Sequence, residues 1–291
     1  MSTVITSDYI SKAVDQVKKI KPDYRLMLDL YERIFIAQEN SRKTIRMQEY
    51  TISDEVLSVK LKEKFPLVEV SEFIIDIESA GELFSAICEI LLTAEGDMSE
   101  SVKKIIDAVD NGTLATENLI PAFLREDEAF FNSIEKDHNI DRRVLGFVIF
   151  SCMKPSLAMF SEMMEKYLDK DNEWDKGYCP VCGSMPELSI FEDNGKRSLL
   201  CGFCGHQWPS KRVYCSFCEN TDHETLRYFE IDNEEEYRVD VCEKCKRYIK
   251  TVDKKKTSRT MYLPLESIAT PYIDLKFKEM GYIPGNIPVD Q

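Results

Sequence analysis

Eight of the ten cysteines in this 291-residue chain form four Cys-x-x-Cys pairs within one short stretch. The pairs are Cys179 with Cys182, Cys201 with Cys204, Cys215 with Cys218, and Cys242 with Cys245. Two intervening residues allow both sulfurs of a tight turn to face one ion, and a second turn completes a tetrahedron of thiolates. The pattern therefore predicts two sites of four cysteines, each for one metal ion.

The spacing between the pairs favours consecutive pairing. Eighteen residues separate the first two pairs and twenty-three separate the last two, so each interval is long enough for one β-hairpin. Only ten residues separate the second pair from the third. Site one then contains Cys179, Cys182, Cys201 and Cys204, and site two contains Cys215, Cys218, Cys242 and Cys245. A cross-braced arrangement that joins the first pair to the third stays open as an alternative.

The residue after each second cysteine is also informative, because this turn favours a positive φ that glycine tolerates. Gly183 and Gly205 occupy that position in site one. Glu219 and Lys246 occupy it in site two, where less favourable turns are therefore predicted.

The expected cofactors are two metal ions in four-cysteine sites, either iron or zinc. Four thiolates suit both ions in geometry, and they can also hold an iron–sulfur cluster. From the residues alone a structural role is favoured, because metal binding replaces the core that a small module cannot build. A dithiol-exchange role is disfavoured, because eight matched ligands leave no spare thiol in this stretch. Cys88 and Cys152 lie on apolar helical faces and are predicted to be small buried hydrophobic residues.

The elements around the cysteines are predicted to be strands. Residues 187–191 and 197–201 form one hairpin around Asp193-Asn194-Gly195, a favoured turn sequence. Residues 226–231 and 237–241 form a second hairpin, and residues 247–252 could add a further strand.

Residues before position 174 have the apolar spacing of helices. The first helix follows a capping Ser7 and ends at Pro22, where a second begins. Three more apolar faces lie at 83–91, 102–109 and 130–134, and the longest candidate covers 141–168. Pro155 is predicted to kink or split that helix.

The predicted fold is α+β, with an all-helical N-terminal domain followed by two small modules of the rubredoxin or zinc-ribbon type. The predicted boundaries are 1–173 for the helical domain, 174–210 and 211–255 for the two metal modules, and 256–291 for a C-terminal segment that packs back on them.

Charge and composition restrict the function. The formal net charge of −14 is concentrated in residues 1–178, which carry −12, whereas residues 179–255 carry −2. Nucleic-acid binding is disfavoured, since phosphate contacts need clustered positive charge. The longest apolar run, residues 144–150, is too short to span a bilayer, and no secretory signal is recognised at the start. A cytoplasmic location without membrane insertion is expected, where thiols stay reduced and bind metal.

The cysteine-rich region resembles the formate dehydrogenase accessory protein family of the FdhE type. The likeness is specific over residues 178–282, and no departure from the family pattern involves a cysteine. It rests on the following stretches of the sequence: Tyr178-Cys-Pro-Val-Cys-Gly-Ser-Met-Pro186, Leu200-Cys-Gly-Phe-Cys204, Arg212-Val-Tyr-Cys-Ser-Phe-Cys218, Arg238-Val-Asp-Val-Cys-Glu-Lys-Cys245, Tyr248-Ile-Lys250, Glu266-Ser-Ile-Ala-Thr-Pro-Tyr-Ile-Asp274 and Gly281-Tyr282.

This resemblance implies a non-enzymatic maturation factor, a chaperone-like protein. It would bind the molybdenum- or tungsten-dependent catalytic subunit of formate dehydrogenase in the cytoplasm, before export or assembly, and rubredoxin-like modules of the family are associated with iron. A homodimer is left open. The candidate partner contacts are Trp208, Arg212, Arg238, Tyr248 and Lys250. The alternative roles are packing of the tryptophan over site one and, for the cations, surface charge or hydrogen bonds to acidic neighbours or cysteine sulfurs.

Two functions of other classes remain as alternatives. A zinc-ribbon adaptor for nucleic acid would need a basic, exposed stripe, and the near-neutral balance of residues 179–255 gives little sign of one. A rubredoxin-like redox protein would need iron, and an accessory factor could itself use such iron. No catalytic residues are predicted, because the sequence has no phosphate-binding glycine loop, nucleophile elbow or histidine-rich metal motif.

Overall fold

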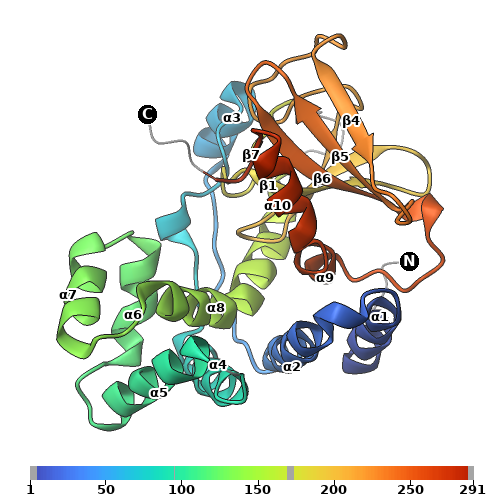
Figure 1. Ribbon diagram of the computed structural model, residues 1–291. Helices are drawn as coiled ribbons and strands as arrows, with labels where there is room; N and C mark the ends of the chain where they lie inside the picture. The colour runs from blue at the N-terminus through green and yellow to red at the C-terminus, as the bar shows by residue number, and fades with distance from the viewer. Residues whose placement is uncertain (1–4, 95, 169–173, 288–291) are drawn as a thin grey trace. The chain divides into compact units, whose positions relative to one another are not determined.

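The structure is a computed structural model that describes residues 5–94, 96–168 and 174–287 (Figure 1). The chain divides into two compact units. One contains the described residues as far as Glu49 together with Val70–Phe160. The other contains Tyr50–Glu69 together with the described residues from Ser161 onward. The segment 50–69 therefore belongs to the second unit, although it lies within the range 1–173 that the sequence pattern assigns to the helical domain.

The first unit is helical, as predicted. Its elements are α1 (Ser7–Ile20), the 3-10 turn η1 (Pro22–Tyr24), α2 (Arg25–Ser41), a second 3-10 turn η2 (Val70–Glu72), α4 (Ile77–Leu91), α5 (Asp97–Asp110), α6 (Thr116–Leu124), α7 (Glu128–His138) and most of α8 (Arg142–Met164). The cap of α1 is Thr6, whose side chain accepts a hydrogen bond from the backbone N–H of Tyr9, and Ser7 is the first helical residue. The sequence pattern missed α6, a short helix that contains Pro121.

Helix α8 is the longest helix in the described ranges, and its apolar side chains are largely buried. It continues through Pro155, so the predicted split does not occur. Together with the following 3-10 turn η3 (Glu165–Tyr167), it is the one helix in the described ranges that is long and apolar enough to cross a membrane. Two thirds of that apolar window (67%) is buried in the structure, as in the core helix of a globular protein.

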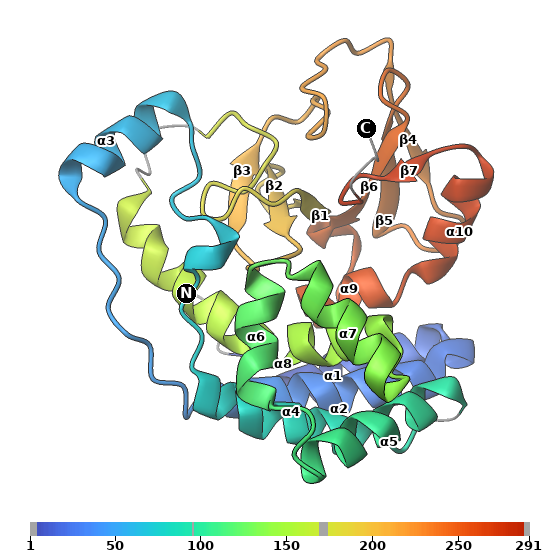
Figure 2. The ribbon, with the colours of Figure 1, turned by 90° about the vertical axis from the view of Figure 1, so that its left-hand side faces the viewer.

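The second unit is built on a single seven-stranded sheet, which Figure 2 shows with β3 and β4 at opposite ends. The strands are β1 (Pro186–Phe191), β2 (Arg197–Cys201), β3 (Gln207–Ser210), β4 (Leu226–Glu230), β5 (Tyr237–Cys242), β6 (Arg247–Asp253) and β7 (Ile283–Pro284). The order is β3-β2-β1-β6-β5-β4, and β7 pairs with β6. Both predicted hairpins form, and Gly195 has the positive φ of +79° that its turn requires.

The two cysteine-bearing hairpins are joined by one pairing that the sequence pattern does not indicate. Strand β1 lies parallel to β6, with Leu188 opposite Lys250 and Phe191 opposite Asp253. Both strands are almost fully buried, as expected for central strands. The two cysteine-bearing hairpins are therefore halves of one sheet, within the predicted α+β architecture of a helical region followed by four-cysteine modules.

The C-terminal segment packs on this sheet. Helix α10 (Pro271–Glu279) lies beside the sheet (Figure 1). It contributes Ile273 and Phe277 to the same core cluster as β5 and β6. The segment before it contains the 3-10 turn η4 (Lys254–Lys256) and α9 (Leu263–Ile268). On the core side of α10, the Tyr248 hydroxyl donates to Asp274 at 2.7 Å.

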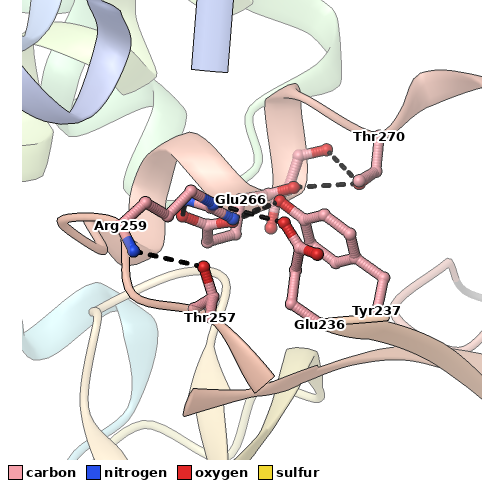
Figure 3. Close-up of polar contacts among 7 residues, drawn as sticks. Glu236, Tyr237, Thr257, Arg259, Glu266 and Thr270 are labelled. Carbon is pink, nitrogen blue, oxygen red and sulfur yellow. Dashed lines mark hydrogen bonds and ion pairs between the residues drawn. The ribbon is translucent and has the colours of Figure 1, made fainter. Parts of the chain in front are cut away.

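A buried ionic network anchors α9, as Figure 3 shows. Glu266 is fully buried and accepts a hydrogen bond from Nη1 of Arg259 at 2.7 Å. Tyr237 of β5 donates to the same carboxylate and accepts from Arg259 at 2.7 Å. Glu236 lies 3.4 Å from Nε of Arg259. Because the buried carboxylate has a cationic partner and a hydroxyl donor, its charge is compensated.

Candidate metal centres

The eight paired cysteines gather into two clusters, in the consecutive arrangement favoured by their spacing. Cys179, Cys182, Cys201 and Cys204 form one cluster; Cys215, Cys218, Cys242 and Cys245 form the other. The sulfurs of each cluster lie within 4.8 Å of one another. Each hairpin supplies one cysteine pair through the end of a strand, Cys201 from β2 and Cys242 from β5.

The sulfur spacing fits a single tetrahedral ion. Metal–sulfur bonds of about 2.3 Å place the sulfurs of a regular tetrahedron about 3.8 Å apart. In the first cluster, Cys179 and Cys204 are 3.7 Å apart and Cys182 and Cys201 are 3.4 Å apart. In the second, the corresponding distances are both 3.7 Å. The donor set and its size therefore suit one zinc or iron ion per cluster, and the ligand assignment itself stays a prediction.

All four Cys-x-x-Cys turns have the same backbone conformation. In each, the N–H of the residue after the second cysteine donates to the carbonyl of the first, at 2.8–3.1 Å. That residue has a positive φ in every turn: +77° at Gly183, +76° at Gly205, +59° at Glu219 and +57° at Lys246. Site two therefore has two non-glycine residues in the left-handed region, which costs roughly 1–2 kcal/mol for each residue relative to an unstrained backbone.

A segment from the N-terminal half of the chain covers the first turn of site one. The backbone N–H groups of Leu67 and Val68 donate to the carbonyls of Pro180 and Val181, at 2.9 and 3.0 Å. The hydroxyl of Tyr178 donates to the carbonyl of Lys64 at 2.7 Å. Residues 64–68, which we call the covering segment, follow helix α3 (Asp54–Glu63). The sequence pattern indicated neither this helix nor the contact, because the two partners are more than 110 residues apart.

The two sites differ in exposure. All four cysteines of site one are buried, whereas Cys218 and Cys245 of site two are half-buried. An ion in site two would therefore be the more accessible to solvent and to small chelators.

Hydrogen bonds already favour a thiolate in each cluster. Burial acts to raise the pKa of Cys242, but donors from the Cys245 backbone and the Asn220 side chain outweigh it and lower this pKa to about 7. Nδ2 of Asn220 lies 3.5 Å from the Cys242 sulfur. In site one, hydrogen bonds from Cys179 and the other two thiols lower the pKa of Cys182. Asn220 was not singled out in the sequence, although its place two residues after Cys218 matches that of His206 after Cys204.

His206 and Trp208 form a buried pair beside site one. Their rings are stacked with centroids 6.4 Å apart, and Trp208 is 1% exposed. Burial lowers the pKa of His206 to about 4, so the imidazole is neutral at pH 7. Its Nδ1 is 3.6 Å from Glu165, too far for a hydrogen bond. The burial of Trp208 favours the alternative that it packs over the site.

The remaining candidate contact residues lie in two different places. Tyr248 and Lys250 are buried under α10, where Lys250 pairs with Asp274 at 2.9 Å. Arg212 and Arg238 both lie over the ring of Phe191, at 5.1 and 4.3 Å from its centroid, and Arg238 also pairs with Asp240 at 2.8 Å. The structure thus brings the five residues together only in part: Tyr248 and Lys250 share Asp274, and the two arginines share Phe191. Partner binding by any of the five stays a prediction.

The two other cysteines lie in the helical unit. Cys88 and Cys152 are each 2% exposed, and burial raises the pKa of Cys88 to about 12. Both thiols are therefore protonated at pH 7, consistent with small buried hydrophobic residues.

The chain is an α+β protein in which a helical region is followed by a sheet with two four-cysteine clusters. Comparisons with known proteins identify others that are similar to it in sequence or in fold. Residues 178–212 match the family model described as the FdhE central domain. The chain is similar to the FdhE homolog of Aquifex aeolicus, with 35% identity over 153 residues that cover 50% of this chain and 52% of that one. It is also similar to protein FdhE of Escherichia coli, with 32% identity over 114 residues that cover 38% and 36%.

The fold is shared with a solved structure, that of the FdhE protein from Pseudomonas aeruginosa. The two match with a TM-score of 0.67 over 97% of this chain and 95% of that chain, at 16% identity. The sequence matches span about half the length of the Aquifex relative and about a third of the Escherichia coli one. The cysteine-rich region is thus similar to FdhE proteins in sequence, and the chain as a whole shares the fold of one of them.

Proposed function

We propose that this protein is a non-catalytic accessory factor for formate dehydrogenase. In this proposal it acts in the cytoplasm, where it binds the catalytic subunit that carries molybdenum or tungsten before that subunit is exported or assembled. The observation that carries the proposal is the FdhE central-domain match over residues 178–212, which include all four cysteines of site one.

The geometry supports a binding function over a catalytic one. Each cluster presents four sulfurs to one ion, which leaves no ligand position for a substrate, and a closed four-cysteine site is typical of structural metal. In site one all four cysteines are buried, and the covering segment holds the first turn. In this proposal the metals fix the shape of the sheet, and the surface of that sheet engages the partner.

The test is deletion of the gene in its host, followed by two measurements on the same cells. We expect formate dehydrogenase activity to be lost while the catalytic subunit is still made, as judged by immunoblot. The wild-type gene should restore activity. Cys204→Ser should not, because it removes a ligand of site one. The matched control is Cys88→Ala, which removes a buried cysteine outside both clusters and should restore activity. Normal activity in the deletion strain would contradict the proposal.

A redox role is the second candidate, and the half-buried position of Cys218 and Cys245 favours it for site two alone. An iron ion there would lie close enough to the surface to exchange electrons with another protein. Anaerobic purification followed by metal analysis and a visible spectrum tests it. Thiolate-to-iron absorption that bleaches on reduction would support the role, and a colourless zinc protein would exclude it.

A further inference from the structure

A cleft of about 100 Å³ lies next to site two and has a strongly cationic lining. Two cysteines of the site, Cys215 and Cys242, form part of its wall. Five arginines also line it: Arg197, Arg212, Arg227, Arg238 and Arg247. They come from β2, β4, β5, β6 and the loop before Cys215, so the assembly of the sheet brings them together.

The charges around the cleft do not balance. Asp240 is the one carboxylate among the described residues that line it. Four thiolates on a divalent ion would carry a net charge of −2. Together with Asp240, and with Glu243 at 4.0 Å from Nε of Arg227, they offset four of the five arginines. About one positive charge is left over. Neutralisation of the metal site therefore accounts for part of the arginine cluster, and a surplus of positive charge remains in the cleft.

Two of the arginines are held rigidly at the cleft. The Arg197 side chain is 2% exposed; its Nε donates to Ser189 at 2.8 Å and its Nη1 to the carbonyl of Tyr214 at 2.9 Å. Arg238 is stacked between the rings of Phe191 and Tyr228, at 4.3 and 4.8 Å from their centroids. Its Nε is buried and has no hydrogen-bond partner among the residues that the structure describes. A buried donor without a partner is costly unless a ligand supplies an acceptor.

The other three arginines are more accessible. Arg212 is exposed and lies over the ring of Phe191, and the Arg227 side chain is 64% exposed. Arg247 donates to the carbonyl of Gly285 at 2.5 Å. Within the described ranges, neither Arg212 nor Arg247 has a carboxylate within ion-pair distance. Their guanidinium groups keep donors available for an anion that enters the cleft.

We propose that this cleft binds a phosphate or pyrophosphate group of a small-molecule ligand. Planar guanidinium groups donate in pairs to phosphate oxygens, and several of them can share one phosphate. The surplus positive charge and the donors of Arg212 and Arg247 favour a compact anion, and the volume suits one such group better than a peptide segment. The rings of Phe217 and Tyr228 at the cleft offer apolar surface to the rest of such a ligand. This inference does not depend on the proposed function.

The test uses the full-length, metal-replete protein and isothermal titration calorimetry with inorganic phosphate and with pyrophosphate. We expect saturable binding of at least one of them that weakens as salt rises. Arg212→Gln, and separately Arg227→Gln, should weaken it by about tenfold to a hundredfold, since each removes a charged donor. The control is Lys276→Gln, which removes an exposed positive charge from α10 and should change affinity less than twofold. Circular dichroism and metal content confirm that each variant is folded.

Three results would overturn the proposal. The first is the absence of saturable binding of either anion by the wild type. The second is an equal loss in Lys276→Gln and both arginine variants, which would indicate general electrostatic attraction. The third is binding of an acidic peptide, such as oligoglutamate, that depends on Arg212 while phosphate and pyrophosphate do not bind. That pattern would reassign the cleft to a protein partner.

Discussion

Replacing Gly183 by alanine should disturb site one more than the same change at Gly205, although the two turns share one backbone conformation. Their φ angles are +77° and +76°. They differ in what a new Cβ would meet. At Gly205 no atom of the described residues other than its chain neighbours lies within 4 Å of that Cβ. At Gly183 the Cβ would lie 2.9 Å from Cγ of Pro66 in the covering segment. The pair therefore separates backbone strain from steric contact.

The expected losses of stability follow from the backbone strain and the steric contact. Both variants carry the left-handed strain of a residue with a Cβ, roughly 1–2 kcal/mol. Gly183→Ala adds the displacement of Pro66 or of the turn itself, about 1–3 kcal/mol as for other overpacked sites. Pro66→Ala would remove Cγ and leave only its Cβ, which lies 3.6 Å from the new atom, an ordinary contact. We therefore expect Pro66→Ala to rescue most of the added loss in the double variant.

The assay is denaturant unfolding of the metal-replete protein, monitored by the fluorescence of Trp174 and Trp208 and by release of metal to a coloured chelator. The four proteins of the cycle are the wild type, Gly183→Ala, Pro66→Ala and the double variant, with Gly205→Ala as the control. Equal destabilisation by the two glycine variants would refute the steric argument. So would a double variant whose loss is the sum of the two single losses, because the two positions would then be uncoupled.

Two further predictions concern the metals and the buried network. Because Cys218 and Cys245 are half-buried whereas the cysteines of site one are buried, limited chelation should remove one ion per chain quickly. Cys218→Ser should abolish this fast phase of metal release. A fast phase that persists in the variant would contradict the assignment of the more accessible ion to site two. Glu266→Gln should destabilise the protein by about 3–5 kcal/mol in denaturant unfolding, because it leaves Arg259 buried without its main anionic partner. Glu236→Gln, at 3.4 Å from the same arginine, should lower the free energy of unfolding clearly less. Equal losses in the two variants would contradict the main role given to Glu266.

Local features of site one and site two could be predicted from the sequence because each depends on a few neighbouring residues. A Cys-x-x-Cys turn closes through its own backbone, and a glycine after the second cysteine indicates the positive φ that Gly183 adopts. Both hairpins could be predicted for the same reason, because two strands joined by a short turn pair with each other. Even Glu219 and Lys246, which lack glycine's freedom, adopt that conformation, because the fold of the turn outweighs the preference of one residue.

Contacts between distant segments were decided only by the tertiary structure. The parallel pairing of β1 with β6 turns two predicted modules into one sheet, and strand patterns alone do not specify which distant strand is the neighbour. The covering segment contacts Pro180 and Val181 through backbone N–H groups. Every residue except proline has such a group, so the sequence does not indicate this contact. The arginine cleft has the same origin, because nothing in the sequence indicates that the sheet brings Arg197 and Arg238 together beside site two. Residue type and spacing are enough to predict the metal ligands. The surfaces around these ligands depend on which buried faces pack against each other, and that is decided by the tertiary structure.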